Sequence, residues 1–416
     1  MTSSATRVLI LTSLFPSRPG EKQGNFVLDQ VRELAAQGAD VTVLVAKPWI
    51  PSLLRSYANR EKLRVDPAEY SLEPFRVTNA SFFSLPRFAL GRLAAHFVRN
   101  LVPAIEFLNQ QQPFDVIHAH GIQLGHAAVE AAARLRIPSV VTIHGVETAA
   151  RFDNSKAKRD QIADTIDRAT RVILVGSPLR DYVRKYTKKS DHCIVIGNGF
   201  TSYPALTPSA LIPRSRPLRV IAISNYEESK GFEILISAID SLEPEYRSKI
   251  EIVLVGAGSG FETIHHQVDR LGLSDSVHYT GPLLHREAMA ELLAADVFCL
   301  PSWRESFGIM YTEAMSMGKL TIGCRGQGPS DFIQHLETGY LVDPRSSTSV
   351  ADALRWVLQN LRQAKTIAER GKAYAFSNLT WKQNAAKILD LYRSLISHES
   401  TLEKPRASTG HAALKV

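Results

Sequence analysis

The segment SWRESFGIMYTEAMSMGKLTIGC (302–324) directly follows an apolar run, DVFCLP (296–301), and ends in another, KLTIGC. Residues 306–308 have the pattern of a tight turn, and helical spacing continues from there to Met317, where Gly318 ends it. A strand, a turn, a helix and a second strand in this order make a parallel β-α-β unit. The segment therefore predicts a parallel sheet covered by helices.

The same alternation extends in both directions from this segment. Short apolar runs, typical of buried parallel strands, alternate with helical patterns throughout. The runs form two blocks: 7–14, 41–46, 115–120, 139–145 and 171–176 in the first, and 218–224, 249–256, 276–281, 296–301, 319–324 and 338–342 in the second. We therefore expect two α/β units, with ligands bound outside the carboxyl ends of the strands, in the cleft between them.

A proline-rich stretch separates the two blocks. Residues 201–217, TSYPALTPSALIPRSRP, have no clear period and mark a linker. We expect a first domain over 1–205, a linker over 206–217 and a second domain over 218–380. A C-terminal helix over 381–400 and a disordered tail over 401–416 would follow.

Composition excludes several classes of protein. The 416 residues include only three cysteines and no CxxC pair, which excludes a disulfide framework and a cysteine-rich zinc module. No apolar run is long enough for a transmembrane helix, and the N-terminus does not resemble a signal peptide. No GxxxxGK[ST] loop is present, which disfavours an NTPase. These features predict a cytoplasmic protein.

The net charge of +8 lies entirely in residues 1–205. A basic first half indicates an anionic partner, such as phospholipid or a phosphate-linked acceptor, and a plain solubility charge is the alternative. Nucleic acid is not expected as a partner, because no recognition module and no interleaved arginine–aromatic surface is found.

Two carboxylates lie eight positions apart in the opening segment. The backbone N–H groups of Gly308, Ile309 and Met310 would lie at a helix N-terminus, which favours an anion such as phosphate. Glu313, on the helix, could accept two hydrogen bonds from a ribose diol, and Glu305, before the turn, could accept from sugar hydroxyls. The alternative is a pair of surface carboxylates beside an ordinary turn.

The segment resembles the ExxxxxxxE signature of family-4 glycosyltransferases, which are retaining enzymes of the GT-B fold. The resemblance also includes LTSLFPS…QGNFV, HAHG, TIHG, SKGFEILISAI, the GxG after KIEIVLV, and TGYLVDP. The sequences of the first strand and the GNFV loop are similar to those of the family branch that builds bacterial cell-surface polysaccharides. The resemblance implies two Rossmann-like domains facing each other across a cleft, the first for the acceptor and the second for a nucleotide-sugar donor.

The resemblance implies an activity and a set of site residues. A hexosyl group would pass from a nucleotide-diphosphate sugar to a carbohydrate or lipid-linked acceptor, with retention of configuration. No cofactor or metal is implied, and the chain has no DxD motif. Helix 381–400 would cross back to the first domain. The implied catalytic residues are His144, Lys230 and Glu305; the implied donor-binding residues are Gly24, Asn225, Lys230, Ser306, Phe307, Gly308, Ile309, Met310 and Glu313; and His118 and His120 lie on the acceptor side.

Two positions depart from the family pattern. Asn225 stands where the family has an arginine, so stabilisation of the diphosphate would be weaker unless Arg304, Arg325 or another cation compensates. Asp331 stands where the family has a glutamate. A catalytically silent GT-B scaffold subunit and a sugar-nucleotide epimerase therefore stay open as alternatives.

A basic amphipathic segment, FFSLPRFALGRLAAHFVRNLV (82–102), is the candidate membrane face. Leu90, Leu93, Phe97 and Leu101 recur at helical spacing, with arginines on the opposite side, at Arg92 and Arg99. Such a helix can lie among lipid headgroups, as a peripheral contact at the inner face of the cell membrane. The alternative is a helix that packs on its own domain.

Overall fold

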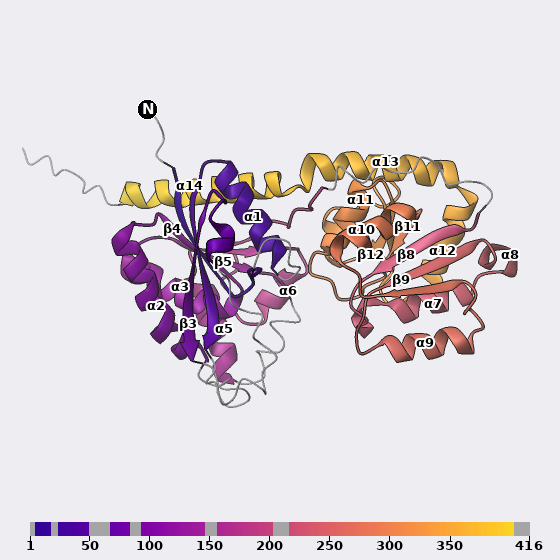
Figure 1. The fold of residues 1–416 in the computed structure, drawn as a ribbon, viewed down its shortest axis with the longest axis horizontal. Helices are drawn as coiled ribbons and strands as arrows, with labels where there is room; N and C mark the ends of the chain where they lie inside the picture. The colour runs from indigo at the N-terminus through magenta and orange to yellow at the C-terminus, as the bar shows by residue number, and fades with distance from the viewer. Residues whose placement is uncertain are drawn as a thin grey trace, which may run out of the picture.

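The computed structural model describes residues 5–17, 24–49, 67–83, 93–145, 156–202 and 216–402. Two parallel sheets form two lobes that lie side by side (Figure 1). Most of the predicted linker 206–217 lies outside the described residues, as does the predicted tail from residue 403 onward.

The first lobe contains a seven-stranded sheet in the order β3-β2-β1-β4-β5-β6-β7, with every neighbouring pair parallel. Successive residues of its central strand point to opposite faces: Val8 and Ile10 pack in one cluster, and Leu9 and Leu11 in another. The strands are β1 (Arg7–Thr12), β2 (Asp40–Trp49), β3 (Arg76–Phe83), β4 (Val116–His120), β5 (Ser139–Ile143), β6 (Arg171–Leu174) and β7 (Cys193–Val195).

Helices cover both faces of this sheet. Helices α2 and α3 pack over the face of Leu9 and Leu11, whereas α1 and the C-terminal helix α14 pack over the opposite face. The helices of the lobe are α1 (Asn25–Ala36), η3 (Pro67–Tyr70), α2 (Leu93–Gln111), α3 (Ile122–Leu135), α5 (Lys156–Arg168) and α6 (Leu179–Arg184), joined by α14 (Trp381–Leu402).

The second lobe contains a six-stranded parallel sheet in the order β10-β9-β8-β11-β12-β13. Its strands are β8 (Leu218–Ile223), β9 (Ile250–Val255), β10 (Val277–Gly281), β11 (Val297–Cys299), β12 (Leu320–Cys324) and β13 (Tyr340–Val342). Its helices are η5 (Glu228–Lys230), α7 (Phe232–Asp240), α8 (Pro244–Arg247), α9 (Phe261–Arg270), α10 (His285–Ala294), α11 (Ile309–Ser316), η6 (Gly328–Asp331), α12 (Ser347–Gln359) and α13 (Leu361–Asn378).

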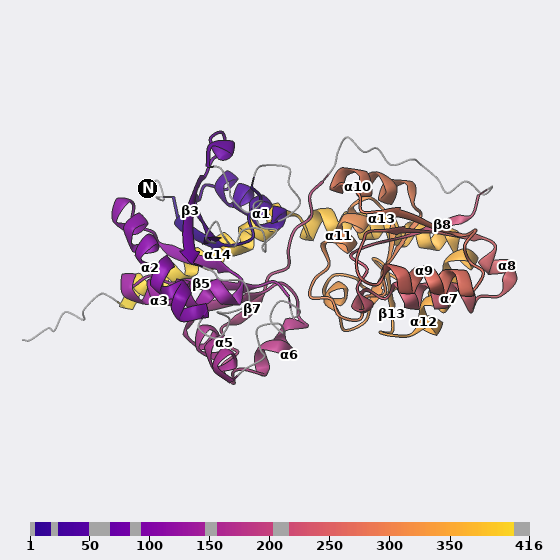
Figure 2. The same ribbon diagram turned by 60° about the horizontal axis from the view of Figure 1, so that its bottom comes forward.

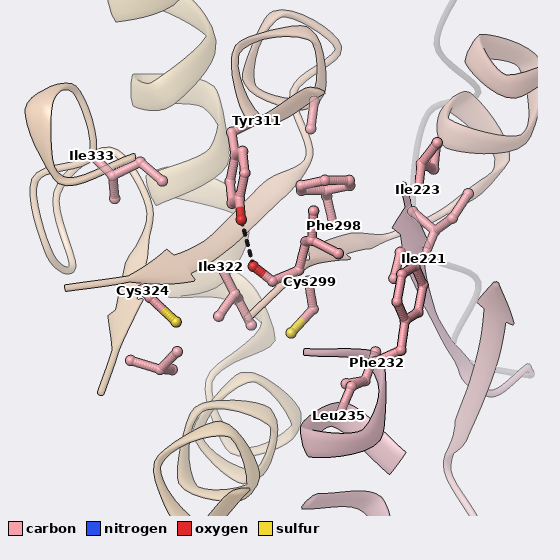
Figure 3. Packing of buried hydrophobic residues seen from close by; sticks show 14 of the residues in the cluster. Ile221, Ile223, Phe232, Leu235, Phe298, Cys299, Tyr311, Ile322, Cys324 and Ile333 are labelled. Carbon is pink, nitrogen blue, oxygen red and sulfur yellow. Dashed lines mark hydrogen bonds between the residues drawn. The ribbon is translucent and has the colours of Figure 1, made fainter. Parts of the chain in front are cut away.

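The core of the second lobe lies on both sides of its central strands. Figure 3 shows Phe298 and Cys299 of β11 beside Ile221 of β8, with Phe232 of α7 packed below them. Cys193, Cys299 and Cys324 are all buried free thiols, as expected for a chain without a disulfide framework.

The sequence predicted the α/β fold and most of its strands. All six runs of the second block are strands, and so are the five runs of the first. Strands β3 and β7 were missed. RVTNASFF contains polar residues at strand positions, and CIV is too short to show a period.

The C-terminal helix crosses from the second lobe to the first. In Figures 1 and 2, α13 lies along the second lobe and α14 continues along the first, beside α1. At the junction, Phe200 N–H donates to the Leu379 carbonyl (3.0 Å). Nearby, the buried Asn384 side chain donates to the Gly197 carbonyl (2.7 Å) and accepts from Gln30 (2.9 Å).

Part of the candidate membrane face packs against the protein itself. Phe97 and Leu101, on α2, are buried at 4% and 0% exposure in the cluster that covers the first sheet. These two side chains therefore support the alternative of a helix packed on its own domain. Arg87, Leu90 and Arg92 lie outside the described residues.

Candidate active site

Each sheet has one place where the strand order reverses, and the candidate site lies at this place in the second sheet, against the first lobe. In the second sheet, β8 has β9 on one side and β11 on the other. The connections that leave the carboxyl ends of β8 and β11 run in opposite directions, which opens a crevice between them. The loop after β8 carries Lys230, and the loop after β11 carries Glu305.

The turn before α11 requires glycine. Gly308 has φ +87°, and a Cβ there would lie 2.5 Å from Cδ2 of Tyr311. No side chain caps the helix, and the Tyr311 N–H donates to the Gly308 carbonyl (3.1 Å), so the N–H groups of Ile309 and Met310 are left for another acceptor. Helix α11 ends at Ser316, one residue before the predicted end.

Tyr311 holds this helix against the sheet. Its buried hydroxyl donates to the Leu300 carbonyl at the end of β11 (2.6 Å), and its ring meets Phe298 edge-on at 5.2 Å (Figure 3). The helix N-terminus is therefore fixed relative to the strand that precedes it.

Lys230 and Glu305 form an ion pair in the crevice. Lys230 Nζ donates to Glu305 Oε2 (3.0 Å), and the two side chains are only 16% and 15% exposed. Gly231, with φ +76°, lets the chain after Lys230 approach the Pro301 carbonyl closely. The two loops are thus packed against each other through backbone as well as side chains.

A cavity of about 450 Å³ lies between the lobes at this point. This volume suits a small-molecule ligand. It brings together most of the residues implied by the resemblance: His144, Lys230, Glu305, Ser306, Phe307, Gly308, Ile309 and Met310. It also contains residues that were not predicted: Leu14, Phe26, Gly145 and Asn198 from the first lobe, and Ile223, Ser224, Leu300 and Tyr311 from the second.

Some of the unpredicted residues left a trace in the sequence. Phe26 belongs to the GNFV motif, which forms the start of α1 and not a loop, and its ring packs against the His144 imidazole at 4.8 Å between centroids. Asn198 follows β7, which is too short to recognise, so nothing in the sequence indicated that its loop reaches the cavity.

Five implied site residues do not line this cavity: Gly24, His118, His120, Asn225 and Glu313. Gly24 has a backbone role, because a Cβ there would lie 2.6 Å from the Leu14 carbonyl carbon. Asn225 is next to Ser224, which does line the cavity.

Glu313 is buried behind the turn, with 3% of its surface exposed. His285 Nε2 lies 3.0 Å from Glu313 Oε1, whereas Glu313 Oε2 is buried without a hydrogen-bond partner. Burial raises the pKa of this carboxyl, and its hydrogen bond to His285 partly offsets that rise. His285 was not predicted, since a single histidine at the start of a helix carries no specific signal.

Three imidazoles extend from the cavity into the first lobe. His144 Nε2 and His120 Nδ1 share a hydrogen bond (2.9 Å) with the rings stacked at 5.1 Å, and His118 stacks on His120 at 4.7 Å. His118 is fully buried, and its two ring nitrogens bond to the hydroxyls of Tyr392 and Thr142. His118 therefore connects β4 to α14 and does not line the cavity.

Burial keeps these histidines neutral. It lowers the pKa of His144 to about 4 and that of His118 to about 3, and it lowers the pKa of His120 well below its ordinary value. His144 therefore meets a ligand as an uncharged imidazole near pH 7.

Asp331, which departs from the family pattern, and the two arginines that could compensate for Asn225 have different surroundings. Asp331 accepts hydrogen bonds from the backbone N–H (2.6 Å) and the hydroxyl of Ser177, across the gap between the lobes. Arg325 pairs with Asp343 (3.3 Å) away from the cavity, whereas Arg304 lines the cavity.

Comparison with known proteins agrees with this geometry. The family model described as "Glycosyltransferase Family 4" matches residues 23–201, and the one described as "Glycosyl transferases group 1" matches residues 209–374. The two matches correspond to the two lobes. The chain is a family-4 glycosyltransferase.

Curated relatives of this glycosyltransferase carry names from the same class. A D-inositol 3-phosphate glycosyltransferase of Corynebacterium glutamicum is 26% identical over 407 residues, covering 90% of this chain and 92% of the relative. A GDP-mannose-dependent alpha-(1-6)-phosphatidylinositol monomannoside mannosyltransferase of Mycobacterium tuberculosis is 30% identical over 184 residues, covering 42% and 47% respectively.

A solved structure shows the same fold. Anabaena HepE in complex with UDP superposes with a TM-score of 0.67 at 20% identity, covering 94% of this glycosyltransferase and all of the HepE chain. The fold of the present chain is therefore GT-B, as the resemblance implied.

Proposed function

We propose that this glycosyltransferase moves a hexosyl group from a nucleotide-diphosphate sugar to a carbohydrate or lipid-linked acceptor, with retention of configuration and without a metal. The observation that carries the proposal is the cavity between the lobes, where Lys230 and the N-terminus of α11 meet. Free backbone N–H groups at a helix N-terminus favour a phosphate, and Lys230 adds a cation whose charge its pairing with Glu305 offsets.

The donor's ribose would bind at Glu313. Its Oε2 is buried with no partner, and a buried acceptor in this state gains free energy from any donor that reaches it. A ribose hydroxyl is such a donor. His285 holds the other carboxylate oxygen and so orients the group.

The acceptor would approach from the first lobe, beside Phe26 and His144. The bond from the anomeric carbon to the phosphate oxygen breaks as the bond to the acceptor oxygen forms on the same face. The acceptor proton passes to the departing phosphate oxygen. Among the described residues, Glu305 is the carboxylate that lines the cavity, and its pairing with Lys230 disfavours a role as a nucleophile.

Two observations support the proposed class of acceptor: the charge of the first half of the chain and the names of the relatives. Residues 1–205 carry the whole net charge of +8, which favours an anionic acceptor. The relatives' names include an inositol phosphate and a phosphatidylinositol mannoside. We place the enzyme in the cytoplasm, in peripheral contact with the membrane, and within surface glycan synthesis. In the described part of the chain, no helix is long and apolar enough to cross a membrane.

A thermal-shift and calorimetric panel tests the proposal. The protein is titrated with UDP, GDP, ADP and their common sugar conjugates, and Glu313→Ala is titrated beside it. We expect one base to be preferred, with an increase in melting temperature that Glu313→Ala loses. Glu337→Ala, an exposed carboxylate outside the cavity, is the matched control. No response to any nucleotide would instead indicate a catalytically silent scaffold.

A further inference from the structure

The charges that line the cavity do not balance. Among the described residues, its charged side chains are Lys230, Glu305 and Arg304. Lys230 and Glu305 pair at 3.0 Å and cancel each other, and the lowered pKa of His144, about 4, leaves that ring neutral. Arg304 is therefore the remaining net charge of the cavity.

This charge matters because of the leaving group implied by the proposed function. A nucleotide diphosphate is anionic before the reaction and gains further negative charge as the glycosyl bond breaks. The N-terminus of α11 contributes the equivalent of roughly half a positive charge. With Lys230 already paired, a second cation is needed for charge balance.

The backbone around Arg304 is tied to the turn that carries Lys230. The Trp303 N–H donates to the Ser229 carbonyl (3.0 Å), and the Ser302 hydroxyl donates to the same carbonyl (3.1 Å). Since Ser229 and Lys230 are neighbours in η5, the two cations are held on adjoining segments of one cavity wall.

Other cations near the site are engaged elsewhere. Arg325 pairs with Asp343, and the Arg345 guanidinium lies 3.8 Å above the Trp303 ring. Within the described ranges, no carboxylate lies within ion-pair distance of Arg304, an exposed residue that lines the cavity. Arg304 is therefore available to a ligand at no cost in broken ion pairs.

We propose that Arg304 binds the diphosphate of the donor and stabilises the charge that develops on it, in place of the arginine absent at position 225. The assignment rests on the proposed function. It makes Arg304 a catalytic residue in the loop after β11, whereas position 225 lies in the loop after β8.

The test compares binding of pyrophosphate, which has no base and no sugar, with binding of nucleotides. Inorganic pyrophosphate, and the nucleoside mono- and diphosphate of the preferred base, are titrated calorimetrically into the full-length wild type, Arg304→Gln, Arg304→Lys and the control Arg325→Gln. We expect Arg304→Gln to weaken binding of pyrophosphate and diphosphate by roughly ten- to a hundredfold. Monophosphate binding should change less than the diphosphate binding. Arg304→Lys should retain much of the affinity, and Arg325→Gln all of it.

Turnover provides a second measurement. Arg304→Gln should lower kcat for sugar transfer, because the interaction strengthens in the transition state. If Arg304→Gln binds pyrophosphate and turns over like the wild type, Arg304 is a solvated surface charge and the inference is wrong. If the folded wild type binds no nucleoside diphosphate, the proposed function fails as well, so the two failures are distinguishable.

Discussion

At the scale of single residues, burial controls protonation in the first lobe. His118 is fully buried between Tyr392 and Thr142, and its pKa falls to about 3 from an ordinary value near 6.5. Below pH 6.5 the unfolded chain takes up a proton at this position that the folded chain rejects. Folding stability from this group is thus fully present above pH 6.5 and decreases as the pH falls toward 3.

We therefore predict that His118→Gln flattens the loss of stability at acid pH. In the window from 6.5 to 3, one such histidine lowers the free energy of unfolding by about 1.4 kcal/mol per pH unit. Urea unfolding at a series of pH values measures the slope, and His266→Gln, an exposed histidine on α9, is the control. An equal slope in the wild type and His118→Gln would contradict the prediction.

At the scale of elements, the proposed anion site depends on the turn into α11. Gly308 combines a positive φ with a close approach to the Tyr311 ring, so a side chain there must displace the ring that anchors the helix to Leu300. The cost is more than the 1–2 kcal/mol expected, in order of magnitude, for left-handed strain alone.

We predict that Gly308→Ala loses nucleotide binding and destabilises the second lobe. Gly272→Ala is a matched control, because Gly272 also has a positive φ, +64°, but a Cβ there would meet nothing within 4 Å. Thermal unfolding and calorimetry of both variants separate strain from contact: we expect both to lower the melting temperature and only Gly308→Ala to lose the ligand. Equal binding by the two variants would show that the turn does not form the anion site.

At the scale of the whole molecule, the lobes are held at the edge of the cavity by a polar contact. Asp331 accepts from the N–H and hydroxyl of Ser177, and Gly176 lies so close to Ser306 that a Cβ would fall 1.9 Å from its carbonyl oxygen. The Asp331 side chain, one carbon shorter than the glutamate that the resemblance leads us to expect, is thus used in a contact between the lobes.

We predict that Asp331→Ala loosens the arrangement of the lobes and lowers sugar transfer while each lobe stays folded. Small-angle X-ray scattering should show a larger radius of gyration than in the wild type, and circular dichroism should be unchanged. Asp181→Ala removes a carboxylate that pairs with Arg184 within α6, and should change neither. An unchanged radius in Asp331→Ala would mean that α14 and the junction at Phe200 hold the lobes unaided.

How much of the fold the sequence predicted varies with the length and regularity of each element. The β11–α11–β12 unit was predicted closely, because its strands are continuous apolar runs and Gly308 and Gly318 bound the helix. Strand β7 could not be predicted, since three residues carry no period. The turn at Gly308 lies in the unit that was predicted, whereas Asn198, which lines the same cavity, follows the strand that was not.

The sequence by itself determined the parallel α/β fold, the two-lobe division and the motif that carries Glu305 and Glu313, because these depend on local periodicity and turn chemistry. Only the tertiary structure decided which polar and charged groups meet. The pairing of Lys230 with Glu305, of Glu313 with His285 and of Ser177 with Asp331 joins residues more than 25 positions apart. Such pairs follow from sheet order and lobe packing, which bring together side chains that no sequence spacing connects.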